Sequence, residues 1–362
     1  MGMIVIADDI TGAAEMAGIA LEAGLTVRLA CGTPAAATDQ ATVIATDTRS
    51  MSETEAAAEV RRLAADLPAG IRLFKKTDSA LRGHVVAELK ALMQATGYRR
   101  AVYLPANPSK GRIIRDGVYY IDGTPIADTA FSYDPEFPAH TSSLRERFPD
   151  AAIRGIIMPD AESADDIRHI LSTYDNGHTL FAGAADLFSL AIDYWQLAVS
   201  PNSQQPTAKS QQPKTTLILC GSTQSRPLDL GIPVAPMPRE VYDGQQGADY
   251  WFSRLPASPT HSFILTIPFT HRTGKAVAIH LRTVMAEMAR RLVSRHHPDS
   301  LIIEGGATAW ATLNALGWHE FQIERQVAPG VVQMRSVTSG TLVTLKPGSY
   351  PWGGLFDKDR QG

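Results

Sequence analysis

The sequence has few cysteines, little net charge and no long apolar run, and each shortage argues against a class of protein. Only Cys31 and Cys220 are present among 362 residues, and they lie far apart. A disulfide framework and a cysteine-rich metal site are therefore not expected, and a reducing cytoplasm fits best. No apolar run reaches the roughly 18 to 20 residues of a membrane span, and no secretory signal precedes the first apolar segment.

The charge balance gives no reason to expect nucleic acid or an anionic membrane as a partner. The chain carries 34 basic and 37 acidic residues, for a formal net charge of -3, whereas nucleic-acid-binding domains usually have a basic surface. A chain of this length exceeds what one hydrophobic core usually serves, so we expect two domains. An oligomer stays open, because no heptad or other association signal stands out.

Short apolar runs alternate with helical patterns along most of the chain, which predicts an α/β fold. This alternation is typical of a mainly parallel sheet flanked by helices, and it restarts after a break. The break is residues 199–214, where the composition changes to Ser, Gln, Pro and Lys, as in a linker. We therefore expect one domain over residues 1–198 and a second over residues 215–362.

Polar residues follow the ends of four predicted strands in the first domain. Asp8 and Asp9 follow the apolar run IVIA, and a single carboxylate would be enough to cap the helix predicted next. Because the carboxyl ends of parallel strands meet at one edge of a sheet, all four sets are expected to face one crevice. The other three sets are Asp47 with Arg49; Lys75, Lys76, Asp78, Ser79 and Arg82; and Asn107, Ser109, Lys110 and Arg112.

These residue types suit a small, hydroxylated, anionic ligand. Guanidinium groups such as those of Arg49 and Arg82 bind carboxylates or phosphates through two parallel hydrogen bonds. Carboxylates such as those of Asp9 and Asp78 suit sugar hydroxyls, and one of them could accept a proton from an attacking hydroxyl. Asp9 and Asp78 are both candidates for this base, and the sequence does not choose between them.

A strand, turn and helix pattern in the second domain suits a phosphate group. The stretch LIIEGGATAWATLNALG predicts a strand, a turn at Gly305 and Gly306, and a helix that begins near Thr308 and ends at Gly317. Glycines let the backbone approach a phosphate, and the start of a helix offers unpaired N–H groups. Neither the dinucleotide fingerprint nor a Walker loop is present. Polar turns at residues 220–225 and 345–354 could join this site.

Taken together, the motifs resemble those of the four-carbon acid sugar kinases. The matching stretches are IVIADDITGA, DTRS, FKKTDSALRGH and the run from PANPSKGR to PEFP, followed by CGS, EGGATA, APGV and LVTLKPG. The resemblance implies an N-terminal domain that binds an acid sugar such as threonate, erythronate or 3-oxo-tetronate. It also implies a C-terminal domain that binds ATP, and transfer of the γ-phosphate to the terminal hydroxyl across an interdomain cleft.

The resemblance also assigns residues to each ligand. For the acid sugar it implies Asp9, Arg49, Lys76, Thr77, Asp78 and Ser79, with Lys75 and Arg82 nearby for its carboxylate or the transferring phosphate; Asp8, beside Asp9, is a further candidate. For ATP it implies Ser222, Gly305, Gly306, Ala307, Thr308 and Gly348. Phosphoryl transfer depends mainly on alignment and charge neutralisation, so Mg²⁺ and Lys or Arg clamps are expected to do most of the work.

Two other functions stay open beside the kinase. Ala307 stands where the family usually has an acidic residue, and Ser349, Tyr350 and Pro351 replace a Gly-Phe-Gly turn. The first alternative is therefore a degenerate kinase that binds a sugar acid without turnover. The second is an aldolase or isomerase that uses Lys75 or Lys76 to form a Schiff base, although nothing else in the chain needs a covalent lysine.

Overall fold

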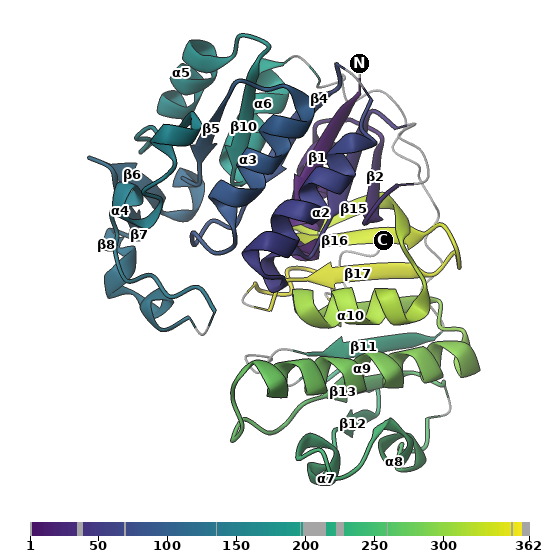
Figure 1. The fold of residues 1–362 in the computed structure, drawn as a ribbon. Helices are drawn as coiled ribbons and strands as arrows, with labels where there is room; N and C mark the ends of the chain where they lie inside the picture. Colours follow the sequence, from purple (N-terminus) through teal and green to yellow (C-terminus); the bar gives the residue numbers. More distant parts are fainter. Residues whose placement is uncertain are drawn as a thin grey trace. The chain divides into compact units, whose positions relative to one another are not determined.

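The chain forms two compact units, Met1–Ser203 and Gln204–Gly362 (Figure 1). The computed structural model describes residues 2–34, 39–68, 70–134, 136–195, 197, 215–221, 228–258, 260–348 and 350–356. The predicted linker at residues 199–214 and the predicted ATP contact Ser222 lie outside the described residues. Among the helices that are described, none combines the length and the apolar character that crossing a bilayer requires.

A parallel sheet forms the centre of the first unit. Its described strands follow the order β2-β3-β1-β4-β10-β5-β9, and every adjacent pair is parallel. The central strand β1 is buried at every position, as expected for a strand covered on both faces. The strands are β1 (Met3–Ala7), β2 (Val27–Cys31), β3 (Ala41–Ala45), β4 (Arg72–Lys76), β5 (Arg100–Leu104), β9 (Ile156–Ile157) and β10 (Thr179–Gly183).

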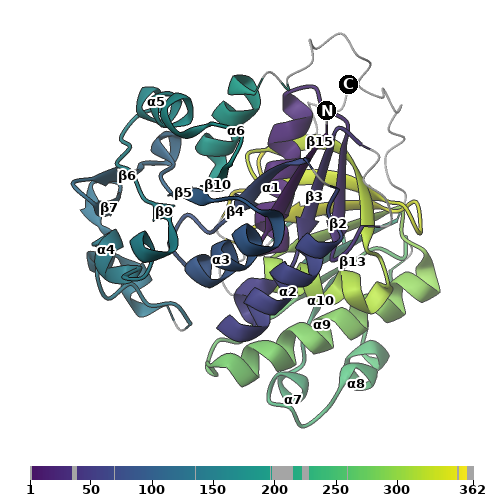
Figure 2. The ribbon, with the colours of Figure 1, turned by 45° about the horizontal axis from the view of Figure 1, so that its top comes forward.

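Helices cover both faces of this sheet, and the face changes next to β1. Helix α1 (Ile10–Glu22), which follows β1, packs beside α6 (Ala185–Tyr194), and α6 in turn contacts α5 (Ala164–Tyr174). Helices α2 (Glu53–Ala65) and α3 (Val85–Thr96), which follow β3 and β4, pack together on the other face (Figures 1 and 2). Neighbouring strands that send their helices to opposite faces leave a crevice at their carboxyl ends.

A small antiparallel sheet and several short helical turns lie between β5 and α5. The sheet has the order β6-β7-β8. This segment brings further polar residues to the carboxyl end of the main sheet. Its elements are η2 (Pro108–Lys110), β6 (Arg112–Arg115), β7 (Val118–Ile121), β8 (Thr124–Pro125), η3 (Ile126–Asp128), η4 (Ala130–Tyr133), α4 (Leu144–Arg147) and η5 (Ala152–Arg154).

The second unit has its own mixed sheet, with described strands in the order β12-β13-β11-β14-β17-β16-β15. The pairs from β12 to β17 are parallel, and β16 pairs antiparallel with both of its neighbours. The strands are β11 (Thr216–Cys220), β12 (Val234–Pro236), β13 (Phe263–Thr266), β14 (Ser300–Glu304), β15 (Glu320–Ala328), β16 (Val331–Ser336) and β17 (Leu342–Lys346).

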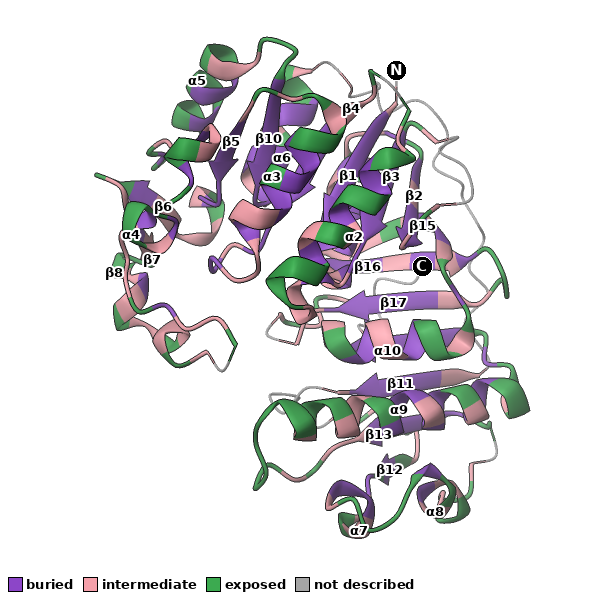
Figure 3. Cartoon of the chain, viewed as in Figure 1, coloured by how far each residue is buried: buried purple, intermediate pink, exposed green. Residues whose placement is uncertain are grey.

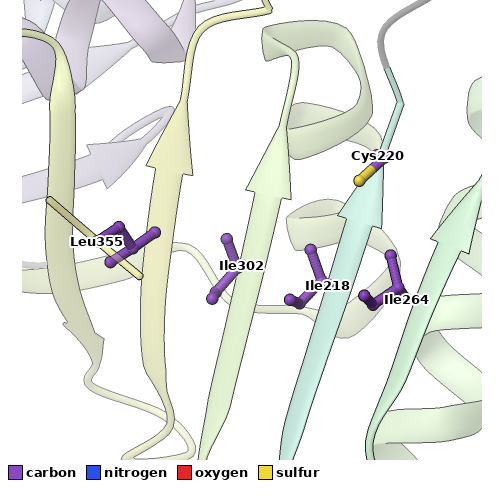
Figure 4. Close-up of a cluster of buried hydrophobic side chains, with 5 residues drawn as sticks. All are labelled: Ile218, Cys220, Ile264, Ile302 and Leu355. Carbon is purple, nitrogen blue, oxygen red and sulfur yellow. The ribbon is translucent and has the colours of Figure 1, made fainter. Parts of the chain in front are cut away.

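The two faces of this second sheet are covered differently. Helices α9 (Lys275–His296) and α10 (Gly306–Leu316) pack together along one face, with α7 (Arg239–Tyr242) and α8 (Ala248–Ser253) nearby. A cluster of buried apolar residues packs instead against side chains of irregular segments, among them Leu228 and Trp352. The cluster consists of Ile218, Cys220, Ile264, Ile302 and Leu355 (Figure 4).

Burial follows the α/β pattern predicted from the sequence. The strands of both sheets are largely buried, and the helices expose one side (Figure 3). The predicted fold class, helices flanking mainly parallel sheets, is confirmed in each unit.

Gly183, at the carboxyl end of β10, tests how tightly the first sheet is packed. A Cβ at this position would lie 2.0 Å from the backbone oxygen of Leu104 on β5. We expect Gly183→Ala to lower the free energy of unfolding by about 1–3 kcal/mol, because backbone cannot move aside as a side chain can. Gly2→Ala is the control, since its nearest atoms lie at 3.6 Å. Equal urea midpoints for the two variants would contradict this packing.

Candidate active site

Two adjacent carboxylates follow β1, and only one of them caps a helix. Asp9 is the N-cap of α1: its Oδ1 accepts a hydrogen bond from the Gly12 N–H at 2.9 Å, and its Oδ2 accepts one from the Thr11 hydroxyl at 2.5 Å. This pairing satisfies a backbone group that has no partner within the helix. Asp8 makes no such contact, and its side chain is only 3% exposed, so capping does not explain why it is there.

Arg49 lies among three carboxylates from two strands. It belongs to the 3₁₀ turn η1 (Thr48–Ser50), which follows β3. Its Nε and one terminal nitrogen each lie 2.9 Å from Asp8 Oδ2, and that terminal nitrogen lies 3.1 Å from Asp9 Oδ1. Its other terminal nitrogen lies 3.5 Å from Asp78 Oδ1. Burial alone would lower the pKa of Arg49, but the three carboxylates outweigh it and raise that pKa well above its usual value.

Asp78 organises the loop that follows β4. The Arg82 guanidinium holds both of its oxygens, with Nε 3.0 Å from Oδ2 and a terminal nitrogen 2.8 Å from Oδ1. Oδ2 also accepts a hydrogen bond from the Ala80 N–H at 2.8 Å. Burial favours a raised pKa for Asp78, but Arg49 and Arg82 outweigh it and hold that pKa far below its usual range. The carboxylate is therefore a stable acceptor for cations.

The turn through Leu81 is braced from the insertion after β5. Leu81 has a φ of 62°, in the left-handed region that costs energy for a residue with a side chain. Its carbonyl oxygen accepts two hydrogen bonds from Arg147, at 2.9 and 3.2 Å. From the same insertion, Asp134 lies 3.6 Å from Arg82. These contacts hold the loop over the end of the sheet.

The fourth predicted set reaches the same edge through two further contacts. Arg112 donates a hydrogen bond to the Ser79 hydroxyl. Lys110 lies 2.6 Å from Oε1 of Glu15 on α1, and Lys76 lies 3.8 Å from the other oxygen of Glu15. Glu15 was not among the sequence candidates, although it stands one helical turn after Thr11 and thus faces the same end of the sheet.

The Lys75 side chain lies in the interior of the unit, where it pairs with an acid on α3. Its Nζ lies 2.8 Å from Oε2 of Glu88 on α3, and the two side chains are 1% and 2% exposed. Glu88 also accepts a hydrogen bond from the Thr48 hydroxyl at 3.0 Å. The hydroxyl oxygens of Thr48 and Thr46 lie 2.9 Å apart, and Thr46 donates its proton to the carbonyl oxygen of Ala7. We call these five residues the buried polar chain.

The buried polar chain connects the segments that carry the site. It ends at Ala7, directly before Asp8, and it passes through Thr48, directly before Arg49. The sequence motifs do not include Glu88, because a single acid in a helix is usually a surface charge. A signal was present, since Glu88 falls between the buried apolar residues Val85 and Leu89.

The second unit carries its own strand-end cluster. Lys346, at the end of β17, lies 2.5 Å from Oε1 of Glu304, at the end of β14, and both side chains are 2% exposed. Its Nζ also donates to the carbonyl oxygens of Pro347 and Gly348, at 3.1 and 3.2 Å. The predicted ATP contact Gly348 therefore lies beside a buried ion pair.

The predicted glycine turn is present, and the helix begins two residues earlier than expected. Gly305 has a φ of 97° and is the N-cap of α10, so Gly306, Ala307 and Thr308 form the first turn. No side chain among the described residues caps this turn. A Cβ at Gly221 would lie 2.0 Å from the Thr308 hydroxyl oxygen, so glycine there lets the end of β11 approach α10.

Models of known protein families match the two parts of the chain that carry these clusters. A model of a sugar-binding N-terminal domain matches residues 3–152, and a model of a nucleotide-binding C-terminal domain matches residues 264–350. The chain is 25% identical over 405 residues to the 3-oxo-tetronate kinase of Pectobacterium atrosepticum, covering 96% of this chain and 95% of that protein. The chain belongs to the four-carbon acid sugar kinase family. The resemblance predicted from the motifs is thus confirmed.

A further relative and two solved structures are also similar to this chain. The D-threonate kinase of Bordetella bronchiseptica is 36% identical over 153 residues, a match that spans 39% of this chain and only 37% of that protein. A structure from Salmonella typhimurium LT2 matches with a TM-score of 0.73 at 18% identity, over 98% of this chain and 97% of that one. A Haemophilus influenzae structure matches with a TM-score of 0.67 at 18% identity, over 96% and 97%. Both show the shared fold.

The buried pair of Lys75 and Glu88 gives a stability test. Glu88→Gln leaves the Lys75 ammonium buried without a counter-charge, so we expect the free energy of unfolding to fall by about 3–5 kcal/mol. Adding Lys75→Met should restore much of this loss, because the double variant has no unpaired buried charge. Urea denaturation of the wild type, Glu88→Gln and the double variant measures both effects. A Glu88→Gln loss below about 0.5 kcal/mol would show that the pair is unimportant.

Proposed function

We propose that the protein is an ATP-dependent kinase that phosphorylates the terminal hydroxyl of a small sugar acid, most simply one with four carbons. The observation that carries this proposal is the cluster of Arg49 with Asp8, Asp9 and Asp78, at the strand ends where ligands bind in α/β folds. It lies in the part of the chain that matches a sugar-binding domain. The names of the relatives, D-threonate kinase and 3-oxo-tetronate kinase, support the same class of substrate.

The proposed sugar-acid domain offers both cations and acceptors. Arg82 and Lys110 have side chains that are 32% and 30% exposed, so they can receive the substrate carboxylate. Asp9, with a side chain that is 17% exposed, and the segment from Lys76 to Ser79 can bind hydroxyls. A neutral sugar offers no carboxylate to the exposed donors of Arg82 and Lys110, so we expect the site to bind acids in preference to neutral sugars.

We assign ATP to the second unit. The first turn of α10, from Gly305 to Thr308, presents N–H groups that no side chain of the described residues caps, which suits phosphate oxygens. Gly348 and Ser222 complete the proposed contacts. Mg²⁺ would arrive with the phosphates, since in nucleotide sites it is usually held by them and by one or two carboxylates. The described residues contain no cluster of three or more His, Cys, Asp or Glu arranged for a metal, and such a site needs none.

The pairing of Lys346 with Glu304 favours one competing function. A lysine at a strand end beside a glycine turn suits phosphate, but here the ammonium is already neutralised by a buried carboxylate at 2.5 Å. Ala307 adds no charge to the turn. A protein that binds the sugar acid and has lost nucleotide turnover is therefore the alternative, whereas the ion pair of Lys75 with Glu88 speaks against a Schiff base at Lys75.

Release of ADP from ATP and Mg²⁺, measured against sugar acids of three to six carbons, tests the proposal. We expect turnover with one or two four-carbon acids and none with the matching neutral sugars, because those lack the carboxylate that Arg82 would bind. Thermal shifts with the acids but not with ATP, and no ADP release, would support the binding protein instead.

Arg49→Ala and Asp9→Ala test whether the first unit binds the sugar acid and the second unit binds ATP. Each variant is expected to lower kcat/KM at least about 100-fold, because each removes a charge at the proposed sugar site. ATP affinity, measured by calorimetry, should stay within about threefold of the wild type. Arg28→Ala is the control, since Arg28 pairs with Asp39 away from this cluster, at 2.7 Å. Equal losses of ATP affinity in the first two variants would contradict the assignment.

A further inference from the structure

The three carboxylates around Arg49 differ in how many of their oxygens already accept a hydrogen bond. Both oxygens of Asp9 accept hydrogen bonds, one from the Gly12 N–H and the other from Thr11. Both oxygens of Asp78 are held by Arg82. Asp8 has Oδ2 on Arg49, but Oδ1 is buried and has no hydrogen-bond partner among the described residues.

A buried acceptor without a donor is a costly feature that needs an explanation. Leaving such a group unsatisfied costs about 1–3 kcal/mol, so the great majority in native proteins find a partner. Among the residues that the structure describes, the buried hydroxyl of Thr77 also has no hydrogen-bond partner. Because Ala7 is in register with Lys76, Asp8 and Thr77 are the next residues on adjacent strands. Two unsatisfied oxygens at neighbouring strand ends point to a ligand that carries hydroxyl groups.

We propose that Asp8, through Oδ1, is the base that accepts the proton of the substrate hydroxyl that becomes phosphorylated. This proposal rests on the proposed kinase function. As the O–H bond of the sugar acid breaks, its proton passes to Oδ1 and the oxygen forms a bond to the γ-phosphorus of the nucleoside triphosphate. The bond from that phosphorus to the bridging oxygen breaks, and its electron pair leaves with the nucleoside diphosphate. Asp8 then returns its proton to water.

The electrostatics of the cluster favour Asp8 over its two neighbours. Burial raises the pKa of Asp8 above the usual value for a carboxyl group, against the opposing effect of Arg49. Burial acts in the same direction on Asp9, but Arg49, Lys76 and Thr11 outweigh it and lower its pKa. A base works best when its pKa lies near the working pH, so a raised carboxyl is the better acceptor.

Charged and titratable groups face Asp8 from each element around it. The backbone of the loop after β4 also closes on the site, since a Cβ at Gly83 would lie 3.3 Å from Asp8 Oδ2. This close approach keeps the carboxylate out of bulk water and so supports its raised pKa. The charges that act on Asp8 are those of Arg49 from η1, Asp9 at the start of α1, and Lys75 and Lys76 on β4. Tyr103 on β5 also interacts with Asp8, and Asp78 shares Arg49 with it as an ion-pair partner.

Asp8→Asn separates a base from a binding group, because asparagine keeps an oxygen for Arg49 and loses the proton acceptor. With the best sugar acid and saturating ATP and Mg²⁺, we expect the single-turnover rate to fall about 100-fold or more. Affinity for the acid and the thermal midpoint should stay close to the wild type. The wild-type rate should fall as the pH falls through the pKa of Asp8, and Asp8→Asn should lack that limb.

Asp39→Asn is the matched control, since it alters another carboxylate paired with an arginine, Arg28. It should keep the wild-type rate and pH profile. An Asp8→Asn rate within threefold of an active wild type would overturn the proposal and leave Oδ1 to an internal water. Loss of acid binding in Asp8→Asn, as in Asp9→Asn, would make Asp8 a binding residue and overturn it too. A wild type inactive on every acid overturns the kinase function itself, and the base with it.

Discussion

The guanidinium group of Arg49 is the contact on which the first unit's site depends. Three carboxylates at one sheet edge would repel one another strongly in a region shielded from water. Arg49 contacts all three, and Arg82 adds a second cation at Asp78. The cluster can therefore hold several negative charges close together. The three carboxylates differ in their partners, because Asp78 has two cationic partners and Asp8 is held through one oxygen only.

The buried polar chain positions Arg49 among the three carboxylates. A long side chain can reach three partners only if the backbone that carries it is held. Thr48, the residue before Arg49, hydrogen-bonds to Glu88, and Glu88 is held by Lys75. Such a network has a cost of desolvation, which its members offset only while all of them are paired. The part of the unit furthest from solvent thus determines the geometry of the proposed ligand site.

Much of the first unit could be predicted from residue types at strand ends, and Lys75 shows the limit of that method. The sequence predicts both Lys75 and Lys76, which are adjacent, as ligand contacts. Successive residues on a strand point to opposite faces, so Lys75 meets Glu88 on α3 and Lys76 meets Glu15 on α1. The alternation of side chains between the two faces of the sheet can be predicted from the sequence. The face on which a buried acid lies cannot be predicted in this way, because it depends on how α1 and α3 pack.

In the second unit, the glycine turn could be predicted from the sequence but a contact between two strands could not. The sequence predicted the glycine turn, since strand, diglycine and helix are local signals. It did not predict that Glu304, the residue before Gly305, would neutralise Lys346 from a neighbouring strand. That contact is set by the register of β14 against β17, which no local pattern specifies. Glu304 and Lys346 are aligned partners in that register, so the pair is built into the sheet, and a phosphate that recruited Lys346 would have to compete with a carboxylate already in place.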